Sequence, residues 1–151
     1  MLRLVLIQPQ IPPNTGNIAR TCAATATPLH LVGPLGFEIT DRQLKRAGLD
    51  YWPHVNLHQH DSIDSFKAVA RPGRWIAFST KGSENYSKFA FQDNDWLLFG
   101  CETSGIPPAL MEACDARVYI PMEQKHVRSL NLSVSAALGL FEARRQLGQL
   151  V

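Results

Sequence analysis

Residues 96–107 read WLLFGCETSGIP, and they carry the clearest signal of the fold in this sequence. It opens with an unbroken apolar run, Trp96 to Phe99, which is typical of a strand buried on both faces of a parallel sheet. Gly100 ends the run, a polar loop with a second glycine follows, and Pro107 stands where a helix begins. Ligands of open α/β sheets bind beyond the carboxyl ends of such strands, so this loop is a candidate binding site.

One acidic side chain, Glu102, lies between the two glycines of the loop, Gly100 and Gly105. Glycine lets a backbone approach a ligand closely, and a carboxylate in such a loop needs a partner. The spacing matches neither the dinucleotide fingerprint nor the phosphate-binding P-loop. A ligand-binding loop and a plain strand–turn–helix connection therefore both fit the spacing.

Segments of strand and helix character alternate along the rest of the chain. Strands are predicted at 2–8, 30–32, 55–58, 75–79 and 118–120, and helices at 15–26, 41–48, 62–70 and 130–147. The alternation predicts an α/β fold, a mostly parallel sheet with helices on both faces. Because no linker, repeat or low-complexity tract interrupts the 151 residues, we expect one domain over 1–151.

The composition limits the class of protein. Hydrophobic residues are 45% and charged residues 19% of the chain, which is typical of a globular protein. The net charge of +2 is too small to indicate a nucleic-acid partner. No apolar run approaches the roughly 18 residues that a bilayer span needs, and the apolar start runs into Gln8-Pro9 without a cleavage site. We therefore expect a cytoplasmic protein with no membrane partner.

The three cysteines, Cys22, Cys101 and Cys114, are odd in number and have no C-x-x-C spacing. A reducing compartment keeps such thiols free. We expect them in or near the core, with no disulfide and no metal.

Residues 14–20 read NTGNIAR and follow Pro12-Pro13. Asn14 is predicted to cap the helix that follows, so that backbone N–H groups at its N-terminus form an anion site. Arg20, a turn and a half further on, would reach the same place or an adjoining phosphate. An ordinary cap followed by a solvated arginine fits these residues as well.

The third segment runs from Ile120-Pro121-Met122 to the SLNLS stretch at 129–133. Ser129 or Asn131 is predicted to cap the last helix, and the backbone of the same loop is equally suited to hold the edge of an adenine. From 132 to 141 the apolar residues of that helix fall on nearly every side, so something must cover them. A second copy of the chain and the rest of the same monomer are the two candidates.

Taken together, the three segments resemble the three motifs of the SPOUT superfamily of RNA methyltransferases, in its TrmH-like 2′-O-methyltransferase branch. The match runs in order and at the family's spacing, through NTGNIAR, LLFGCETSGIP, and IPM followed by SLNLS. The likeness covers nearly the whole chain, including QIPP at 10–13 and RAGLDY at 46–51. It is strongest to the single-domain tRNA (cytidine/uridine-2′-O)-methyltransferases of that branch.

The resemblance implies a C-terminal trefoil knot, the SPOUT α/β-knot, whose loops bind S-adenosyl-L-methionine (SAM). Carried over residue by residue, the cofactor would contact Phe78, Thr80, Gly100, Glu102, Gly105, Ile120, Met122, Ser129 and Leu130. The resemblance also implies a homodimer joined through the first and last helices, with Arg20 of one subunit near the SAM of the other. It implies no metal.

The implied reaction is transfer of a methyl group from SAM to a ribose 2′-hydroxyl. The residues at the family's catalytic positions are Arg20, Asn14, Glu102, Ser129 and Asn131. Because a guanidinium is rarely neutral, we expect Arg20 to orient the hydroxyl and stabilise the developing alkoxide, while a phosphate or another group takes the proton. Asn14 and Asn131 would hold Arg20 and the ribose, and Glu102 would pair with the cationic part of the site.

The implied substrate is the wobble nucleotide, a C or a modified U, in the anticodon loop of tRNA-Leu isoacceptors. Candidates for RNA contact are Arg42, Lys45, Arg46, Lys81 and Arg128, each of which also fits a solvated surface charge. Tyr51 and Trp52 are candidates to stack on unpaired bases. A SPOUT enzyme for another tRNA position or for rRNA, and a non-catalytic SAM- or RNA-binding module, are the alternatives.

Overall fold

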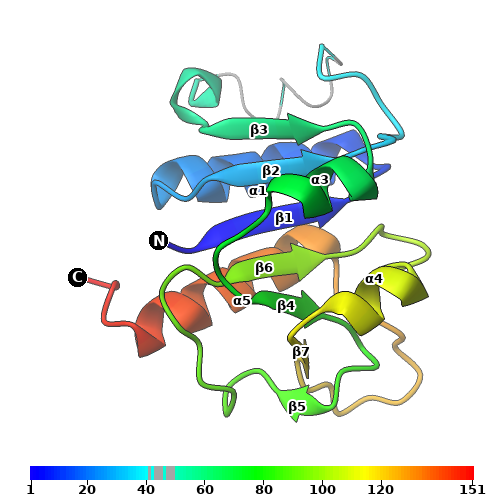
Figure 1. Ribbon diagram of the computed structural model, residues 1–151, viewed down its shortest axis with the longest axis vertical. Helices are drawn as coiled ribbons and strands as arrows, with labels where there is room; N and C mark the ends of the chain where they lie inside the picture. The colour runs from blue at the N-terminus through cyan, green and yellow to red at the C-terminus, as the bar shows by residue number, and fades with distance from the viewer. Residues whose placement is uncertain (41, 43–45, 47–49) are drawn as a thin grey trace.

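The computed structural model describes all residues except 41, 43–45 and 47–49. Lys45 and most of the helix expected over 41–48 therefore lie outside the described residues. The described strands form one sheet in the order β3-β2-β1-β6-β4-β7-β5 (Figure 1). They are β1 (Arg3–Ile7), β2 (Leu29–Val32), β3 (Leu57–His60), β4 (Trp75–Phe78), β5 (Glu84–Asn85), β6 (Trp96–Phe99) and β7 (Ala116–Tyr119). Every neighbouring pair in this sheet is parallel, which confirms the predicted α/β fold.

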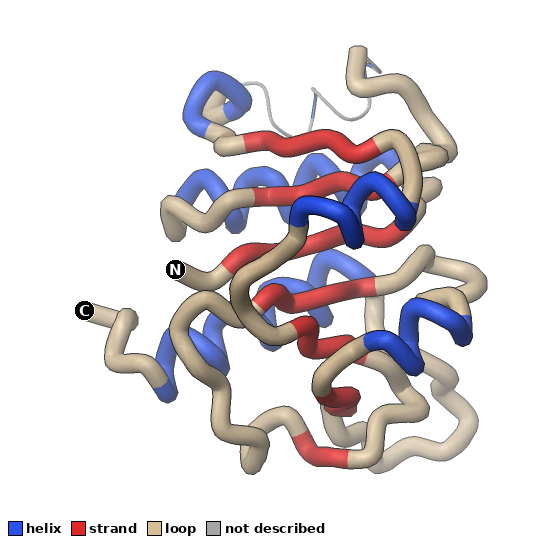
Figure 2. The backbone as a smooth tube through the Cα atoms, in the orientation of Figure 1, coloured by secondary structure: helices blue, strands red, loops and turns tan. Residues whose placement is uncertain are grey.

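Helices cover both faces of the sheet. They are α1 (Pro12–Ala24), the short 3-10 helix η1 (Trp52–His54), α3 (Ile63–Val69), α4 (Pro108–Ala113) and α5 (Leu132–Gln146). Leu4 and Leu6 of β1 pack toward α1 and α5, while Val5 and Ile7 pack toward α3 and α4. Figure 1 and Figure 2 show these two pairs of helices on opposite sides of the strands. The expected arrangement of helices on both faces is confirmed.

The stretch that opens at Trp96 forms the central strand, β6. It pairs with β1 on one side and with β4 on the other, and its residues are buried. Phe99 lies opposite Leu6 of β1 and Phe78 of β4. Because parallel strands end at the same edge of a sheet, the segments that leave β4 and β6 emerge next to each other.

Several boundaries differ from the predictions, each for a local reason. Helix α1 begins at Pro12, because proline suits the first turn of a helix, so Asn14 is inside the helix and the prediction that it is the cap is wrong. Strand β3 spans Leu57–His60 instead of 55–58, because its pairing with β2 starts at Leu57. No pattern in the sequence predicts the two-residue β5, which exists through its pairing with β7.

The expected position of the cysteines in the core is confirmed, because Cys22, Cys101 and Cys114 are all buried. Burial raises the pKa of Cys22 to about 12 and that of Cys114 to about 11. Among the described residues, no helix combines the length and the apolar character that crossing a membrane requires. The trefoil knot depends on how the chain is threaded, which strand order and register do not test, and it stays a prediction.

Three histidines stack at the β2–β3 edge of the sheet. His30 of β2 is buried, and its ring lies 4.5 Å from that of His58 and 5.2 Å from that of His60, centre to centre. A hydrogen bond of 2.9 Å joins His30 Nδ1 to His60 Nε2. Burial is the main reason that the pKa of His30 is lowered, to about 3, so this ring is neutral at physiological pH.

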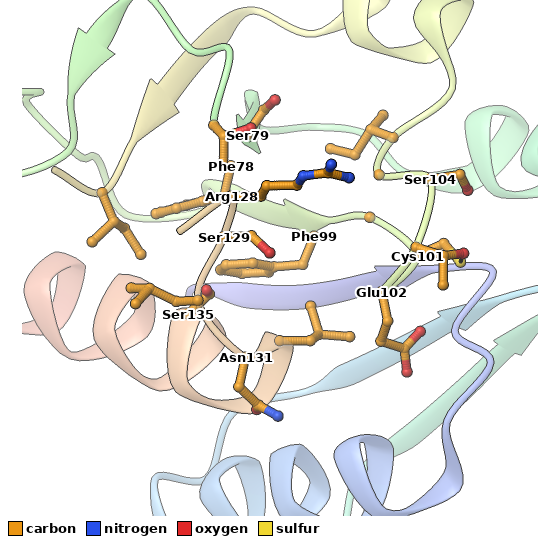
Figure 3. Close-up of a pocket in the computed structure, with 18 of the residues that line it drawn as sticks. Phe78, Ser79, Phe99, Cys101, Glu102, Ser104, Arg128, Ser129, Asn131 and Ser135 are labelled. Carbon is orange, nitrogen blue, oxygen red and sulfur yellow. Dashed lines mark hydrogen bonds between the residues drawn. The ribbon is translucent and has the colours of Figure 1, made fainter. Parts of the chain in front are cut away.

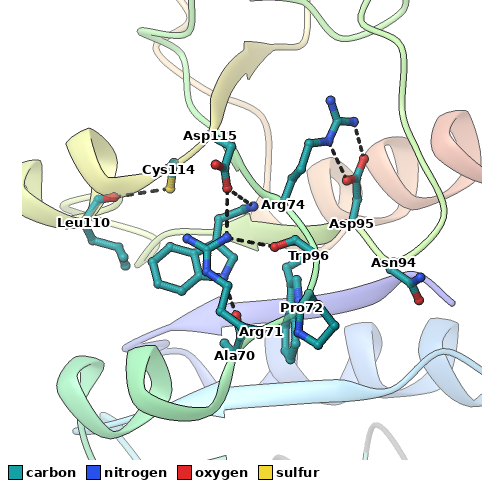
Figure 4. Close-up of polar contacts among 12 residues, drawn as sticks. Ala70, Arg71, Pro72, Arg74, Asn94, Asp95, Trp96, Leu110, Cys114 and Asp115 are labelled. Carbon is teal, nitrogen blue, oxygen red and sulfur yellow. Dashed lines mark hydrogen bonds and ion pairs between the residues drawn. The ribbon is translucent and has the colours of Figure 1, made fainter.

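Polar side chains brace the amino ends of β4 and β6, opposite the edge where ligands of such sheets bind (Figure 4). Asp95 is fully buried and accepts two hydrogen bonds from the Arg74 guanidinium, at 2.9 Å and 2.7 Å. Asp115 accepts from the Trp75 backbone N–H at 2.8 Å and from Arg71 at 3.2 Å. The pKa of Asp115 is lowered first by that backbone bond and then by Arg71. These contacts hold the amino ends of β4 and β6 in place, and the loops that leave the carboxyl ends of the same strands form the site.

Candidate active site

A cavity of about 570 Å³ opens at the carboxyl ends of β4, β6 and β7 (Figure 3). Its walls come from the loops after these strands, from the start of α5 and from the start of α1. The lining includes every position that the resemblance implies for SAM: Phe78, Thr80, Gly100, Glu102, Gly105, Ile120, Met122, Ser129 and Leu130. It also includes four of the candidate catalytic residues: Asn14, Glu102, Ser129 and Asn131. Segments far apart in the sequence thus converge on one cavity, while the roles of their residues stay predictions.

The loop after β6 is closed on itself by backbone hydrogen bonds. The Gly105 N–H donates to the Cys101 carbonyl at 2.9 Å, and the Cys101 N–H donates to the Gly105 carbonyl at 3.3 Å. A Cβ on Gly100 would lie 2.2 Å from the Gly105 carbonyl carbon, so only glycine fits there. Gly105 itself has a φ of +71°, which glycine adopts without strain. At these two glycines the loop therefore presents bare backbone to the cavity.

Glu102 ties this loop to the start of α1. The backbone N–H groups of Gln10 and Ile11 donate to its two carboxylate oxygens at 2.9 Å and 2.8 Å, and the Asn14 amide donates at 3.4 Å. A carboxylate is well placed at the N-terminus of a helix, where N–H groups lack partners. These amides are the hydrogen-bond partners of Glu102 among the described residues, and its expected pairing with the cationic part of the site stays a prediction.

Asn131 links the start of α5 to the same network. Its side-chain oxygen accepts from the Ser133 backbone N–H at 2.8 Å, which makes it the N-cap of α5. Its side-chain nitrogen donates to Asn14 Oδ1 at 3.1 Å. The predicted cap at Asn131 is confirmed, and Ser129 lies before it on the cavity wall. Figure 3 shows the Glu102 and Asn131 side chains both turned toward α1.

Two stacked aromatic rings form an apolar side of the cavity. Phe78 and Phe99 lie 4.5 Å apart, centre to centre, with their planes 19° from parallel. Helix α5 comes close to them at Gly139, where a Cβ would lie 2.7 Å from the Phe78 ring. Ile120, Met122 and Leu130 add further apolar surface. This wall suits a flat, weakly polar ring such as adenine.

The polar side of the cavity is mostly neutral. Glu102 is the only acidic residue of the described lining, and it is bound to α1, while Lys81 and Arg128 add positive charge. Burial raises the pKa of Cys101, but hydrogen bonds with Thr103 and Ser104 outweigh it and leave the pKa below its usual value. The basic side chains of Lys81 and Arg128 therefore suit one anionic group of a ligand, such as a carboxylate or a phosphate.

Further lining residues were outside the sequence-based set: Ile11, Ser79, Phe99, Cys101, Ile106, Met111, Leu132 and Ser135. Most are immediate neighbours of the motif residues, so the signal for them is adjacency. Met111 and Ser135 are exceptions, because they enter the lining one helical turn inside α4 and α5. Only the packing of these helices against the loops reveals them.

Arg20 does not line the cavity of its own chain. It is exposed on α1, with its guanidinium carbon 5.4 Å from the centre of the Tyr51 ring. Of the candidate RNA contacts, Arg42 and Arg46 are exposed, while Lys81 and Arg128 line the cavity. Figure 3 shows the Arg128 side chain lying over the cavity. Among the described residues, no group of three or more histidine, cysteine, aspartate or glutamate side chains is arranged to hold a metal ion.

Comparison with known proteins identifies the class. The sequence profile of the SpoU rRNA methylase family matches residues 1–141, so the chain belongs to the SpoU methylase family. The resemblance drawn from the three motifs is thereby confirmed.

Two relatives are similar to this chain over nearly its whole length. A protein of Synechocystis sp. is 56% identical over 152 residues, which are 99% of each chain. A Methylovorus glucosotrophus protein named tRNA (cytidine(34)-2′-O)-methyltransferase is 50% identical over 148 residues, 97% of this chain and 96% of that protein.

Solved structures show the same fold. One, described as giving structural insights into the 2-OH methylation of C/U34 on tRNA, is 49% identical, has a TM-score of 0.91, and is matched over 98% of this chain and 91% of its own. A second is an AdoMet-bound rRNA methyltransferase from Sinorhizobium meliloti, 27% identical with a TM-score of 0.88. The match covers 97% of this chain and 56% of that larger one.

Proposed function

We propose that this protein is a SAM-dependent tRNA 2′-O-methyltransferase that methylates the ribose of nucleotide 34, the wobble position of the anticodon loop. The observation that carries the proposal is the convergence of the three motif loops on one cavity, in a chain 50% identical to a protein named for that reaction. Following the family resemblance, we propose C34 or a modified U34 of tRNA-Leu isoacceptors as the methyl acceptor. A tRNA substrate agrees with the cytoplasmic location expected from the sequence.

The cavity fits SAM in volume and in chemistry. Its volume of about 570 Å³ lies within the range of small-molecule sites. The apolar wall at Phe78 and Ile120 suits the adenine, and the open backbone at Gly100 leaves room for a close approach that a side chain would block. Bound SAM supplies a methyl group activated on a sulfonium, so placing the acceptor in line is the main demand on the protein.

We assign Arg20 to orient the ribose 2′-hydroxyl and to stabilise the alkoxide that develops on it. A guanidinium stays protonated at neutral pH, so it stabilises negative charge better than it accepts a proton. The proton then goes to another group, and a substrate phosphate is our candidate. Asn14, Glu102 and Asn131 bond to one another and to the start of α1, so we assign them to positioning this helix.

A homodimer would bring Arg20 to a cavity. Arg20 lies outside the cavity of its own chain, so a second copy must supply either the arginine or the cavity. Helices α1 and α5 pack side by side on one face of the sheet. Four residues of α5 are buried there, Ala136, Gly139, Leu140 and Ala143, while Val134, Leu138 and Phe141 remain 48%, 38% and 42% exposed in one stripe. We propose that this stripe, together with α1, forms the interface between two copies.

The direct test is transfer of a labelled methyl group from SAM to tRNA. The purified protein is incubated with a tRNA-Leu transcript, with native tRNA, and with a matched transcript that carries deoxyribose at nucleotide 34. We expect label in the substrates that have a 2′-hydroxyl at nucleotide 34 and none in the deoxy control. Equal labelling of the control overturns the proposed substrate, as does labelling of rRNA in preference to tRNA when both RNAs are supplied together.

A second test concerns Arg20. We expect Arg20→Ala to abolish methyl transfer while SAM binding, measured by calorimetry, is retained. Lys67→Ala is the control, because Lys67 is exposed on α3, on the other face of the sheet. If turnover of Arg20→Ala stays within about tenfold of the wild type, equivalent to only ~1.4 kcal/mol, the assignment of Arg20 is wrong.

A further inference from the structure

Tyr51 contacts the arginine to which the proposed reaction assigns the central role. Its ring centre lies 5.4 Å from the Arg20 guanidinium carbon, within the range of a cation–π contact. Tyr51 precedes the 3-10 helix η1, and Arg20 lies in the middle of α1. The contact is therefore made between two separate elements, and it does not depend on neighbours in the sequence.

A second contact fixes the ring against the same helix. The Tyr51 hydroxyl donates to the Gly16 carbonyl at 3.4 Å. Gly16 lies one turn before Arg20 on α1. The Tyr51 hydroxyl therefore contacts one turn of this helix, and the face of its ring contacts the side chain of the next turn. The pKa of Tyr51 is raised above its usual value, because burial and the neighbouring Asp50 outweigh the lowering effect of Arg20. The hydroxyl therefore keeps its proton at neutral pH and can donate it in a hydrogen bond.

An exposed arginine must be held in one orientation if it is to orient a substrate hydroxyl. Its side chain has many rotamers, and holding it in one of them costs conformational entropy. Arg20 is exposed, and Tyr51 is half-buried against α1, which makes the ring the more rigid partner. A flat aromatic face is a suitable guide for a planar guanidinium.

We infer that Tyr51 is a positioning residue for Arg20: its ring holds the guanidinium over α1 in the orientation that the ribose hydroxyl requires. The inference rests on the proposed function, because it is the role of Arg20 that gives the contact its purpose. It differs from the sequence-based expectation that Tyr51 stacks on an RNA base. Both residues belong to one subunit, so the contact is present whichever subunit's cavity Arg20 serves.

The test separates the ring from the hydroxyl. Tyr51→Leu removes the aromatic face, while Tyr51→Phe keeps it and removes only the bond to Gly16. We expect Tyr51→Leu to lower kcat about two- to fivefold, the rate equivalent of one exposed cation–π contact, with an unchanged KM for SAM. Tyr51→Phe should stay within about twofold of the wild type. Tyr86→Leu is the matched control, because Tyr86 is half-buried against the core beyond β5, at the other end of the sheet.

A readout independent of activity is the mobility of the arginine itself. The order parameter of the Arg20 side-chain Nε, measured by NMR relaxation, should fall in Tyr51→Leu and stay unchanged in Tyr51→Phe and Tyr86→Leu. An order parameter that does not respond to Tyr51→Leu overturns the inference, as does a kcat equal to that of Tyr86→Leu. If the wild type transfers no methyl group to tRNA, the proposed function fails instead, and the order parameter still decides whether Tyr51 holds Arg20.

Discussion

Mild acid should destabilise this protein before its carboxylates are protonated, because of His30. The ring is 7% exposed, bonds to His60 and meets the edge of Trp96. Burial is the largest cause that lowers its pKa from 6.5 to about 3, and positive charge on His58, His60 and Arg3 adds to it. The folded protein therefore keeps His30 neutral at a pH where a free histidine takes up a proton.

The sign and size of the effect follow from proton uptake. Below about pH 6.5 the unfolded chain binds a proton at His30 that the folded chain excludes until about pH 3, so the free energy of unfolding falls as the pH falls through this window. Between pH 7.5 and pH 5.0 the loss from this one group amounts to about 2 kcal/mol. That is a large part of the stability of a typical domain.

Urea-induced unfolding at pH 7.5 and pH 5.0, at one fixed protomer concentration, measures the loss. The wild type should lose about 2 kcal/mol more between the two pH values than His30→Leu, whatever the absolute stability of that variant. His54→Gln is the control, because His54 is exposed and its removal should leave the pH dependence of the wild type unchanged. Equal losses in the wild type and in His30→Leu would refute the reasoning, as would an NMR titration of His30 near pH 6.5.

Four further outcomes follow from the structure. Gly100→Ala should weaken SAM binding about tenfold or more in calorimetry, because a Cβ would meet backbone at 2.2 Å, whereas Gly148→Ala, with nothing within 4 Å, should not. Asp95→Asn should lower the free energy of unfolding by about 2–4 kcal/mol in denaturant titrations, because it leaves a guanidinium without its buried partner. Leu138→Glu should convert dimers to monomers in light scattering and abolish methyl transfer, because the charge would enter the proposed interface. Arg128→Ala should raise the KM for tRNA and reduce the slope of log K against log salt by about one, and an unchanged slope would remove Arg128 from the RNA contacts.

The sequence was sufficient to predict the sheet and the place of the site. The run at 96–99 is apolar on both faces, which is typical of a central parallel strand, and the strand ends before Gly100, which lines the cavity. The three motifs were predictable as one site because their spacing resembles a known family. That resemblance, and not the net charge of +2, pointed to RNA.

The partners of the site residues were not predictable in this way. Glu102 was expected to pair with the cationic part of the site, and nothing in the sequence indicated the backbone amides, 91 and 92 positions away, from which it accepts hydrogen bonds. Asn14 was expected to be a cap, but the prolines before it already start the helix, which frees its side chain to bond to Asn131. Such long-range pairings depend on how α1, α5 and the loop after β6 pack against one another. Local sequence patterns do not predict which residues of distant elements come into contact.

The cavity takes walls from Ile11 near one end of the chain and from Ser135 near the other. The cavity therefore forms only after nearly all of these residues have left the ribosome. A nascent chain that lacks the later residues has no complete cavity, so a ligand cannot stabilise it. Contacts so distant in sequence also form slowly during folding. Once they exist, a ligand that binds only the folded chain adds about 2.7 kcal/mol at a concentration a hundredfold above its Kd. SAM bound as we propose would thus stabilise the folded chain in addition to supplying the methyl group.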